Sequence, residues 1–228
     1  MGVVIDALSI VIGTLFGSVF KEKINFKNFA VLGIAIMIIS LVGFLENIFG
    51  VEGAVLKSDD LLIVIFALIL GTLLGDVLRL DSRLGNISDL NNKAVSQIVD
   101  STIFFGVGGM QICGPIMLVC IGDNSQLILK SFIDFPFALM FGMSYGKKVA
   151  FSALPVAAGQ IAIMLLTVLS KNFLDGFVIK QICAMGYIIL FFSGFNLMCE
   201  KRHKINNINM IIGIAVIFAY NALWYIWR

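Results

Sequence analysis

The chain has 228 residues, of which 60% are hydrophobic and 13% are charged, and its formal net charge is +2. Soluble domains are typically about 45–50% apolar and about 25% charged, so this composition excludes a soluble globular enzyme and a disordered segment. The small net charge, without any block of basic residues, also excludes a nucleic-acid-binding domain. What remains is an integral membrane protein, with residues 1–228 as a single domain in the lipid bilayer.

Apolar runs follow one another along the whole chain and predict an all-α, polytopic transmembrane helix bundle. A spanning helix needs about 20 apolar residues, and unbroken runs of this length favour helices over a transmembrane barrel, whose segments are shorter and alternate. We expect about eight helices, within a range of about seven to nine. They cover residues 3–20, 28–48, 61–78, 99–121, 126–146, 149–170, 177–199 and 207–227.

The basic residues are unevenly divided between the two sides of the predicted bundle. Of the 16 lysines and arginines, five fall on one side and the remaining eleven on the other. Cytoplasmic segments carry the excess of basic residues, so the bias predicts a multi-pass protein of the bacterial cytoplasmic (inner) membrane with both termini outside. The five are Lys57, Lys130, Lys171, Lys180 and Arg228.

Two short segments occur twice in the sequence. Residues 13–20 resemble residues 71–78, and both copies contain the pattern Gly-Thr-x-x-Gly. Glycines four residues apart let helix backbones approach closely, so ordinary helix packing is the first interpretation. Residues 32–40 also resemble residues 185–193, with the same spacing between Gly and Ser. Because the expected topology directs these two helices oppositely, this match is consistent with an inverted repeat, as in many transporters.

All three prolines of the chain lie in three consecutive predicted spans, and glycines cluster beside them. Proline removes a backbone donor and clashes with the preceding turn, and in lipid the freed carbonyl groups need other partners. Broken helices of this kind bind substrates and ions in transporters, although simple kinks are an equally good interpretation. Helix breaks are expected at Gly108, Gly109, Gly114, Pro115, Pro136, Pro155 and Gly159.

Ionisable residues inside the predicted spans are the second indication of a functional site. A charge near the centre of a spanning helix costs about 2.5–3.5 kcal/mol on insertion scales. Asp134 lies inside the fifth run, and Lys130 precedes it by one helical turn on the same face. The two residues either bind an ion or a substrate carboxylate, or neutralise each other as a buried structural pair.

Other polar residues of the predicted spans are weaker candidates. Gln160 follows Gly159 and provides either a hydrogen bond between helices or a ligand contact. Asp100 begins the fourth run, where N-terminal capping is the simpler interpretation and a substrate contact is the alternative. Asp6, Glu46 and Asn196 are weaker examples of the same kind.

Sequence signatures of enzymes and of metal or cofactor sites are absent. No G-x-x-x-x-G-K-[ST], H-E-x-x-H or G-x-S-x-G pattern occurs. The four cysteines have no C-x-x-C spacing, and the one histidine, His203, lies in a basic run. We therefore expect no enzymatic activity, no cofactor and no metal site.

The stretch from the fourth to the sixth run resembles a known family. It contains Gly106-Val107-Gly108-Gly109-Met110-Gln111-Ile112-Cys113-Gly114, Gly122-Asp123, residues 127–134 and 151–156, and Gly159-Gln160. In order and spacing, these segments and the two Gly-Thr-x-x-Gly patterns are similar to the bacterial YqgA-like membrane family. The resemblance covers nearly the whole chain and implies a polytopic inner-membrane protein, often described as a transporter, without an established substrate.

The leading functional hypothesis is a small secondary transporter or channel of the cytoplasmic membrane. A small solute or ion would bind near the expected helix breaks, with Lys130, Asp134 and Gln160 as its polar lining. Asp134 would couple transport to H⁺ or Na⁺, since a carboxylate in a medium of low dielectric constant can titrate near neutral pH. The alternative is a non-transporting membrane scaffold or partner subunit whose polar pairs serve folding alone. The small size of the bundle favours a homodimer.

Overall fold

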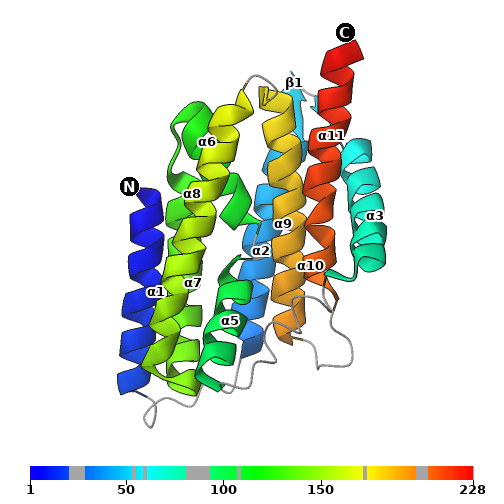
Figure 1. Cartoon of the computed structure of the whole chain (residues 1–228). Coiled ribbons are helices and arrows are strands. Elements are labelled where there is room, and N and C mark those ends of the chain that lie inside the picture. Colours follow the sequence, from blue (N-terminus) through cyan, green and yellow to red (C-terminus); the bar gives the residue numbers. More distant parts are fainter. Residues whose placement is uncertain are drawn as a thin grey trace. The chain divides into compact units, whose positions relative to one another are not determined.

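The computed structural model describes residues 1–20, 29–52, 55–58, 61–80, 93–106, 109–171, 174–198 and 205–227. Nearly all of its elements are helices (Figure 1). In chain order they are α1 (Gly2–Val19), α2 (Phe29–Ile48), the strands β1 (Gly50–Glu52) and β2 (Val55–Lys57), α3 (Leu61–Leu78), α5 (Lys93–Gly106), α6 (Met110–Ile121), α7 (Ser125–Tyr145), the 3-10 helix η1 (Lys147–Ser152), α8 (Ala153–Leu169), α9 (Gly176–Met198), α10 (Asn207–Met210) and α11 (Ile212–Trp227).

The expected all-α, polytopic architecture is confirmed. Among the described residues, 7 helical segments are long and apolar enough to cross a membrane: α1, α2, α3, α7, η1 with α8, α9, and α10 with α11. The helices α5 and α6 pass the same test only as a bent pair. Hydropathy gives no indication of the short antiparallel pair β1 and β2, whose register joins Gly50 to Lys57.

The chain divides into two compact units, which we call unit 1 and unit 2. Unit 1 comprises Met1–Asn28, Ser82–Val107 and Gly114–Val168, and therefore contains α1, α5, α7, η1 and nearly all of α8. Unit 2 comprises Phe29–Asp81, Gly108–Cys113 and Leu169–Arg228, with α2, α3, α9, α10 and α11. The chain passes from unit 2 to unit 1 within α6, after Cys113.

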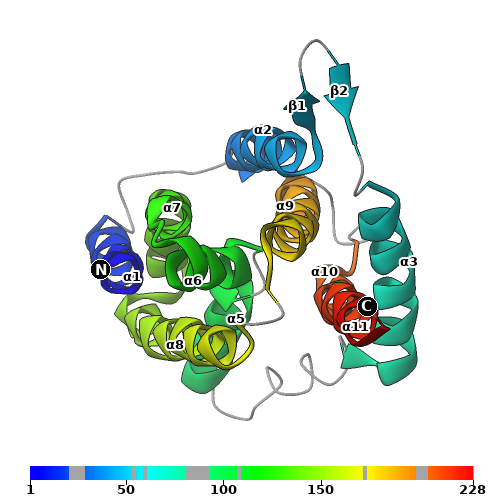
Figure 2. The same cartoon turned by 90° about the horizontal axis from the view of Figure 1, so that it is seen from above.

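In unit 1, α1 and α7 are neighbours whose backbones approach closely at glycines (Figure 1, Figure 2). A Cβ atom on Gly17 would lie 1.9 Å from the carbonyl oxygen of Leu139, and one on Gly142 would lie 2.2 Å from that of Thr14. No side chain fits at such distances, so both positions require glycine. The opposite face of α1 exposes large apolar side chains, which suits contact with lipid.

In unit 2, α3 forms similar contacts with α10 and α11 at the second copy of the Gly-Thr-x-x-Gly pattern. A Cβ atom on Gly71 would lie 2.2 Å from the backbone nitrogen of Gly213, and one on Gly75 would lie 2.5 Å from the Cβ of Asn209. Figure 2 shows α3 beside α11. Both copies of the pattern thus lie in close helix contacts, as the packing interpretation predicts.

The other repeated segment does not have equivalent surroundings in its two copies. Gly33 of α2 packs against Gly194 of α9, whereas Gly186 of α9 packs against Gly109, which precedes α6. These contacts do not confirm an inverted repeat, which stays a prediction.

The direction of α7 bears on the number of membrane crossings. Gly2 at the start of α1 contacts Leu127 near the start of α7, and Gly17 near the end of α1 contacts Leu139. The two helices are therefore parallel and begin on the same side of the bilayer. Because α2 and α3 contribute two crossings between them, a further crossing is needed before α7. If the bent pair of α5 and α6 supplies it as one span, the described residues contain up to 8 candidate membrane spans.

Several expected helix breaks are absent. The helix α6 continues through Gly114 and Pro115, and α7 continues through Pro136. Pro155 is the third residue of α8, where the backbone N–H groups have no partner within the helix in any case. Gly159 lies within the same helix.

The interruption of helical structure in this part of the chain lies elsewhere. The helix α5 ends at Gly106, and α6 begins at Met110. Gly109 is in a turn between the two helices, and Gly108 lies outside the described residues.

Candidate functional site

Four polar side chains from three helices of unit 1 meet in one buried cluster, which we call the charged cluster. Its members are Asp6 of α1, Lys130 and Asp134 of α7, and Gln160 of α8. The Lys130 Nζ lies 3.0 Å from Asp6 Oδ2 and also donates to Asp134 Oδ2. Gln160 Nε2 donates to the same Asp6 Oδ2 at 2.6 Å. Asp6 is thus the residue that joins α1 to both other helices.

The charged cluster is almost completely shielded. The exposed fraction is 0% for Asp6 and Gln160, 3% for Lys130 and 6% for Asp134. No other charged side chain among the described residues is buried to this degree. The helix bundle therefore concentrates its buried charges at a single place.

The position of the charged cluster along the helices places it at membrane depth. Asp6 follows the first residue of α1 by four positions, which is about 6 Å along the helix axis at 1.5 Å per residue. Asp134 follows the first residue of α7 by nine positions, or about 14 Å. Since both carboxylates contact Lys130 Nζ, the charged groups lie close together, in the halves of α1 and α7 that begin at Gly2 and Ser125.

The packing of α1 against α7 sets the position of Asp6. The buried residues of α1 are Gly2, Asp6, Ile10, Gly13, Thr14 and Gly17, which recur at helical spacing and form one face. The glycines of this face bring the two backbones close together, so the short Asp6 side chain reaches Lys130. At the start of both helices, the Gly2 backbone N–H donates to Asn124 Oδ1 at 3.4 Å.

Aromatic residues of α5 pack against α7 on the stretch that follows Asp134. The ring centroids of Phe104 and Phe137 are 4.9 Å apart, and those of Phe104 and Phe141 are 5.1 Å apart. Phe137 and Phe141 follow Asp134 by about one and two helical turns, and therefore lie on the same side of α7. The aromatic contacts thus join α5 to the helix that carries two of the charges.

The structure brings together Lys130, Asp134 and Gln160, the residues predicted as a polar lining. The i, i+4 spacing of Lys130 and Asp134 predicts their contact correctly. Asp6 is only a weak candidate from sequence, although it is central here. The negative charge of Asp6 is the signal that the sequence offers. A carboxylate within an apolar span needs a cation, and Lys130 lies inside another span at a comparable depth.

The other sequence candidates occupy different positions. Asp100 is half-buried in α5 and lies seven residues after its first residue, so the expected N-terminal capping role is wrong. Residues 93–98 also belong to α5, although they are too polar to be predicted as part of a membrane span. In unit 2, Glu46 is exposed near the end of α2. The Asn196 side chain binds the backbone N–H and carbonyl of Ile205 and caps the chain that leads into α10.

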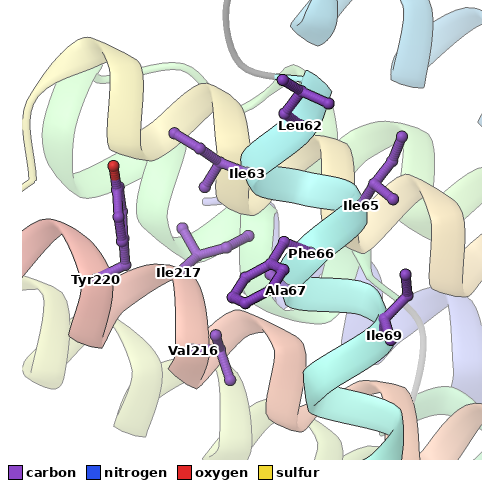
Figure 3. Close-up of a pocket in the computed structure, with 9 residues that line it drawn as sticks. All are labelled: Leu62, Ile63, Ile65, Phe66, Ala67, Ile69, Val216, Ile217 and Tyr220. Atoms are coloured by element: carbon purple, nitrogen blue, oxygen red, sulfur yellow. The ribbon is translucent and has the colours of Figure 1, made fainter.

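A groove in unit 2 has a different chemical character. It lies between α3 and α11, has a volume of about 480 Å³, and is lined by Leu62, Ile63, Ile65, Phe66, Ala67, Ile69, Val216, Ile217 and Tyr220 (Figure 3). The Tyr220 hydroxyl is the one polar side-chain group of this lining. The groove therefore suits acyl chains or another apolar surface and not a charged or polar solute.

Comparison with known proteins gives matches over nearly the whole chain. The family described as "Protein of unknown function (DUF554)" matches residues 1–221. The "Uncharacterized membrane protein YdfK" of Bacillus subtilis is 22% identical over 97% of this chain and 97% of its own length. The "Uncharacterized protein YqgA" of Escherichia coli is 22% identical over 100% of this chain and 98% of its own length. No solved structure matches.

Proposed function

The chain belongs to the DUF554 family, which contains the YqgA-like membrane proteins, and from that premise we propose that it is a secondary transporter or channel for a small solute or ion. The charged cluster of Asp6, Lys130, Asp134 and Gln160 is the proposed binding site. The bacterial cytoplasmic membrane, with both termini outside, is the proposed location, because of the distribution of lysine and arginine.

One observation carries the proposal: every buried charged side chain of the described residues belongs to the charged cluster. Each such charge costs about 2.5–3.5 kcal/mol near the middle of a spanning helix. A buried ion pair seldom stabilises a protein more than apolar residues of the same volume do. An arrangement of this kind is therefore poorly explained by stability, and ionisable residues within the membrane usually mark the path of a substrate or an ion.

The same observation weighs against the alternative of a scaffold or partner subunit. A structural ion pair needs one positive and one negative group, and Lys130 with Asp134 would suffice within α7. The additional carboxylate of Asp6 leaves the charged cluster with more negative than positive groups. A role confined to folding accounts for the hydrogen bonds of Asp6 to α7 and α8, but not for the excess of negative charge.

The test is electrogenic flux in liposomes that contain the purified chain. Currents on a solid-supported membrane are recorded after stepwise addition of NaCl, of KCl, of single amino acids and of small carboxylates such as acetate and succinate. We expect a current with at least one of these probes, and its loss in Asp6→Asn and in Asp134→Asn. Asp123→Asn is the matched control, because Asp123 is the same residue type in unit 1 but lies half-buried between α6 and α7, outside the charged cluster.

Two results would contradict the proposal. One is the absence of current with every probe, although the reconstituted protein is folded and monodisperse. The other is a current that Asp6→Asn and Asp134→Asn leave at the level of the Asp123→Asn control. Either result would favour the scaffold.

A further inference from the structure

The charged cluster contains an odd number of charges. Asp6 and Asp134 are two carboxylates, and Lys130 is the one ammonium group that contacts them. Gln160 is neutral. With all three groups ionised, the charged cluster has a net charge of −1 in a region from which water is excluded. A buried charge without a partner is strongly unfavourable, so one more positive charge is needed.

The two oxygens of Asp6 differ in their surroundings. Asp6 Oδ2 accepts hydrogen bonds from Lys130 and from Gln160. Asp6 Oδ1 is equally buried, yet no group within the described part of the chain donates to it. A carboxylate oxygen left without a donor in the interior loses its hydration without compensation. The missing positive charge and the unsatisfied oxygen are thus found in the same residue.

We propose that Asp6 Oδ1 binds one monovalent cation, either a proton or an alkali metal ion, which brings the charged cluster to neutrality. A proton would form an O–H bond to Asp6, and an alkali ion would be coordinated by the carboxylate; in both cases the net charge changes from −1 to 0. This inference rests on the proposed function, for which it identifies Asp6 as the coupling residue in place of Asp134.

The charged groups around Asp6 are few. The helix α7 presents Lys130 and Asp134 to it, and α8 presents the neutral Gln160. The third element packed against α1 is η1, whose Lys147 and Lys148 are both exposed. Lys130 is therefore a fixed internal cation that compensates one of the two carboxylates, and the bound cation compensates the other.

Binding can be measured on the full chain in detergent, without any flux. Thermal unfolding is recorded in NaCl, LiCl and KCl against choline chloride at constant ionic strength, and the series is repeated over the pH range in which the protein is folded. A ligand that binds only the folded state raises the melting temperature progressively with its concentration. An alkali ion gives a rise with that salt over choline, and a proton gives a rise on mild acidification in choline alone.

Two double variants of equal charge identify the residue that binds the cation. Lys130→Gln/Asp134→Asn keeps only Asp6, and Lys130→Gln/Asp6→Asn keeps only Asp134, so the net charge is −1 in both. We expect the melting temperature to depend more strongly on the cation or on pH in the first than in the second, because only Asp6 has the unsatisfied buried oxygen. Equal dependence in both, or dependence in the second alone, would overturn the assignment to Asp6.

Two further measurements decide the matter if a double variant does not fold. In the wild type, a melting temperature that responds to neither alkali ions nor pH overturns the proposal. The single variant Asp6→Asn is neutral without a bound cation and is expected to lose the response. Cation binding without any current in liposomes would support the cation site and contradict the proposed transport. A current without any response of the melting temperature to alkali ions or pH would support transport and contradict the cation site.

Discussion

Replacing Lys130 by methionine is the most direct test of how the buried charges are held. The Lys130 ammonium lies 3.0 Å from Asp6 Oδ2 and also contacts Asp134, with an exposed fraction of 3%. One such pair is attractive by about 5–6 kcal/mol at an effective dielectric constant of about 20. Desolvation of the lysine offsets part of this. Removal of one partner of a buried pair typically costs about 3–5 kcal/mol, and because two carboxylates lose their cation, we expect a value near the upper end.

The assay is unfolding of the purified chain in mixed micelles with a rising fraction of sodium dodecyl sulfate, followed by circular dichroism. Lys180→Met is the matched control, because Lys180 is exposed on α9, and it should change the free energy of unfolding by no more than about 0.5 kcal/mol.

A triple variant separates lost charge from lost packing. Lys130→Met/Asp6→Asn/Asp134→Asn contains no charge in the cluster, and it should recover most of the stability that Lys130→Met loses. The reasoning is wrong if Lys130→Met costs less than about 1 kcal/mol, well below the usual range for a broken buried pair. It is also wrong if the triple variant is as unstable as the single one.

Three further predictions concern helix packing and the start of α7. Gly17→Ala would place a Cβ 1.9 Å from a backbone oxygen of α7 and should lower the free energy of unfolding by about 1–3 kcal/mol. Gly106→Ala is the control and should be nearly neutral, because the space around Gly106 is open. Equal effects of the two substitutions would contradict the packing argument. Gly71→Ala should lower the free energy of unfolding by a similar amount, because its Cβ would lie 2.2 Å from a backbone nitrogen of α11. An unchanged free energy of unfolding in the dodecyl sulfate assay would contradict this close contact of α3 with α11. The Ser125 backbone N–H and hydroxyl hold the pKa of Asp123 below its ordinary value, so this carboxylate stabilises the fold above pH about 4 and less as the pH falls through its lowered pKa. Ser125→Ala should raise that pKa in an NMR titration, and an unchanged value would refute the assignment.

The positions of most membrane spans could be predicted from sequence because hydropathy is a local property. The predicted runs 61–78 and 126–146 nearly coincide with α3 and α7. The fourth run was less accurate: it begins at residue 99, whereas α5 begins at Lys93. Residues 93–98 mix polar and apolar side chains, so they form a helix without being hydrophobic enough to predict a membrane span.

The proline positions could not be interpreted from sequence alone. The loss of one N–H group matters little at Pro155, since the first N–H groups of any helix have no partner within it. Pro136 lies well inside α7, and its effect depends on the packing of neighbouring helices around the freed carbonyl. Sequence identifies where a hydrogen bond is missing, but the tertiary structure determines whether the helix is interrupted there.

The contact that makes Asp6 central also depends on the tertiary structure, so the sequence alone gives Asp6 little weight. Spacing within one helix predicts the contact of Lys130 with Asp134, because i and i+4 are neighbours. No spacing rule joins Asp6 to Lys130, which are 124 positions apart. Electrostatics does join them, since an aspartate in an otherwise apolar helix requires a positive partner from another helix. Only the structure identifies Lys130 as the partner of Asp6, and it leaves one of the two carboxylates of the charged cluster uncompensated, which is the imbalance from which we infer a bound cation.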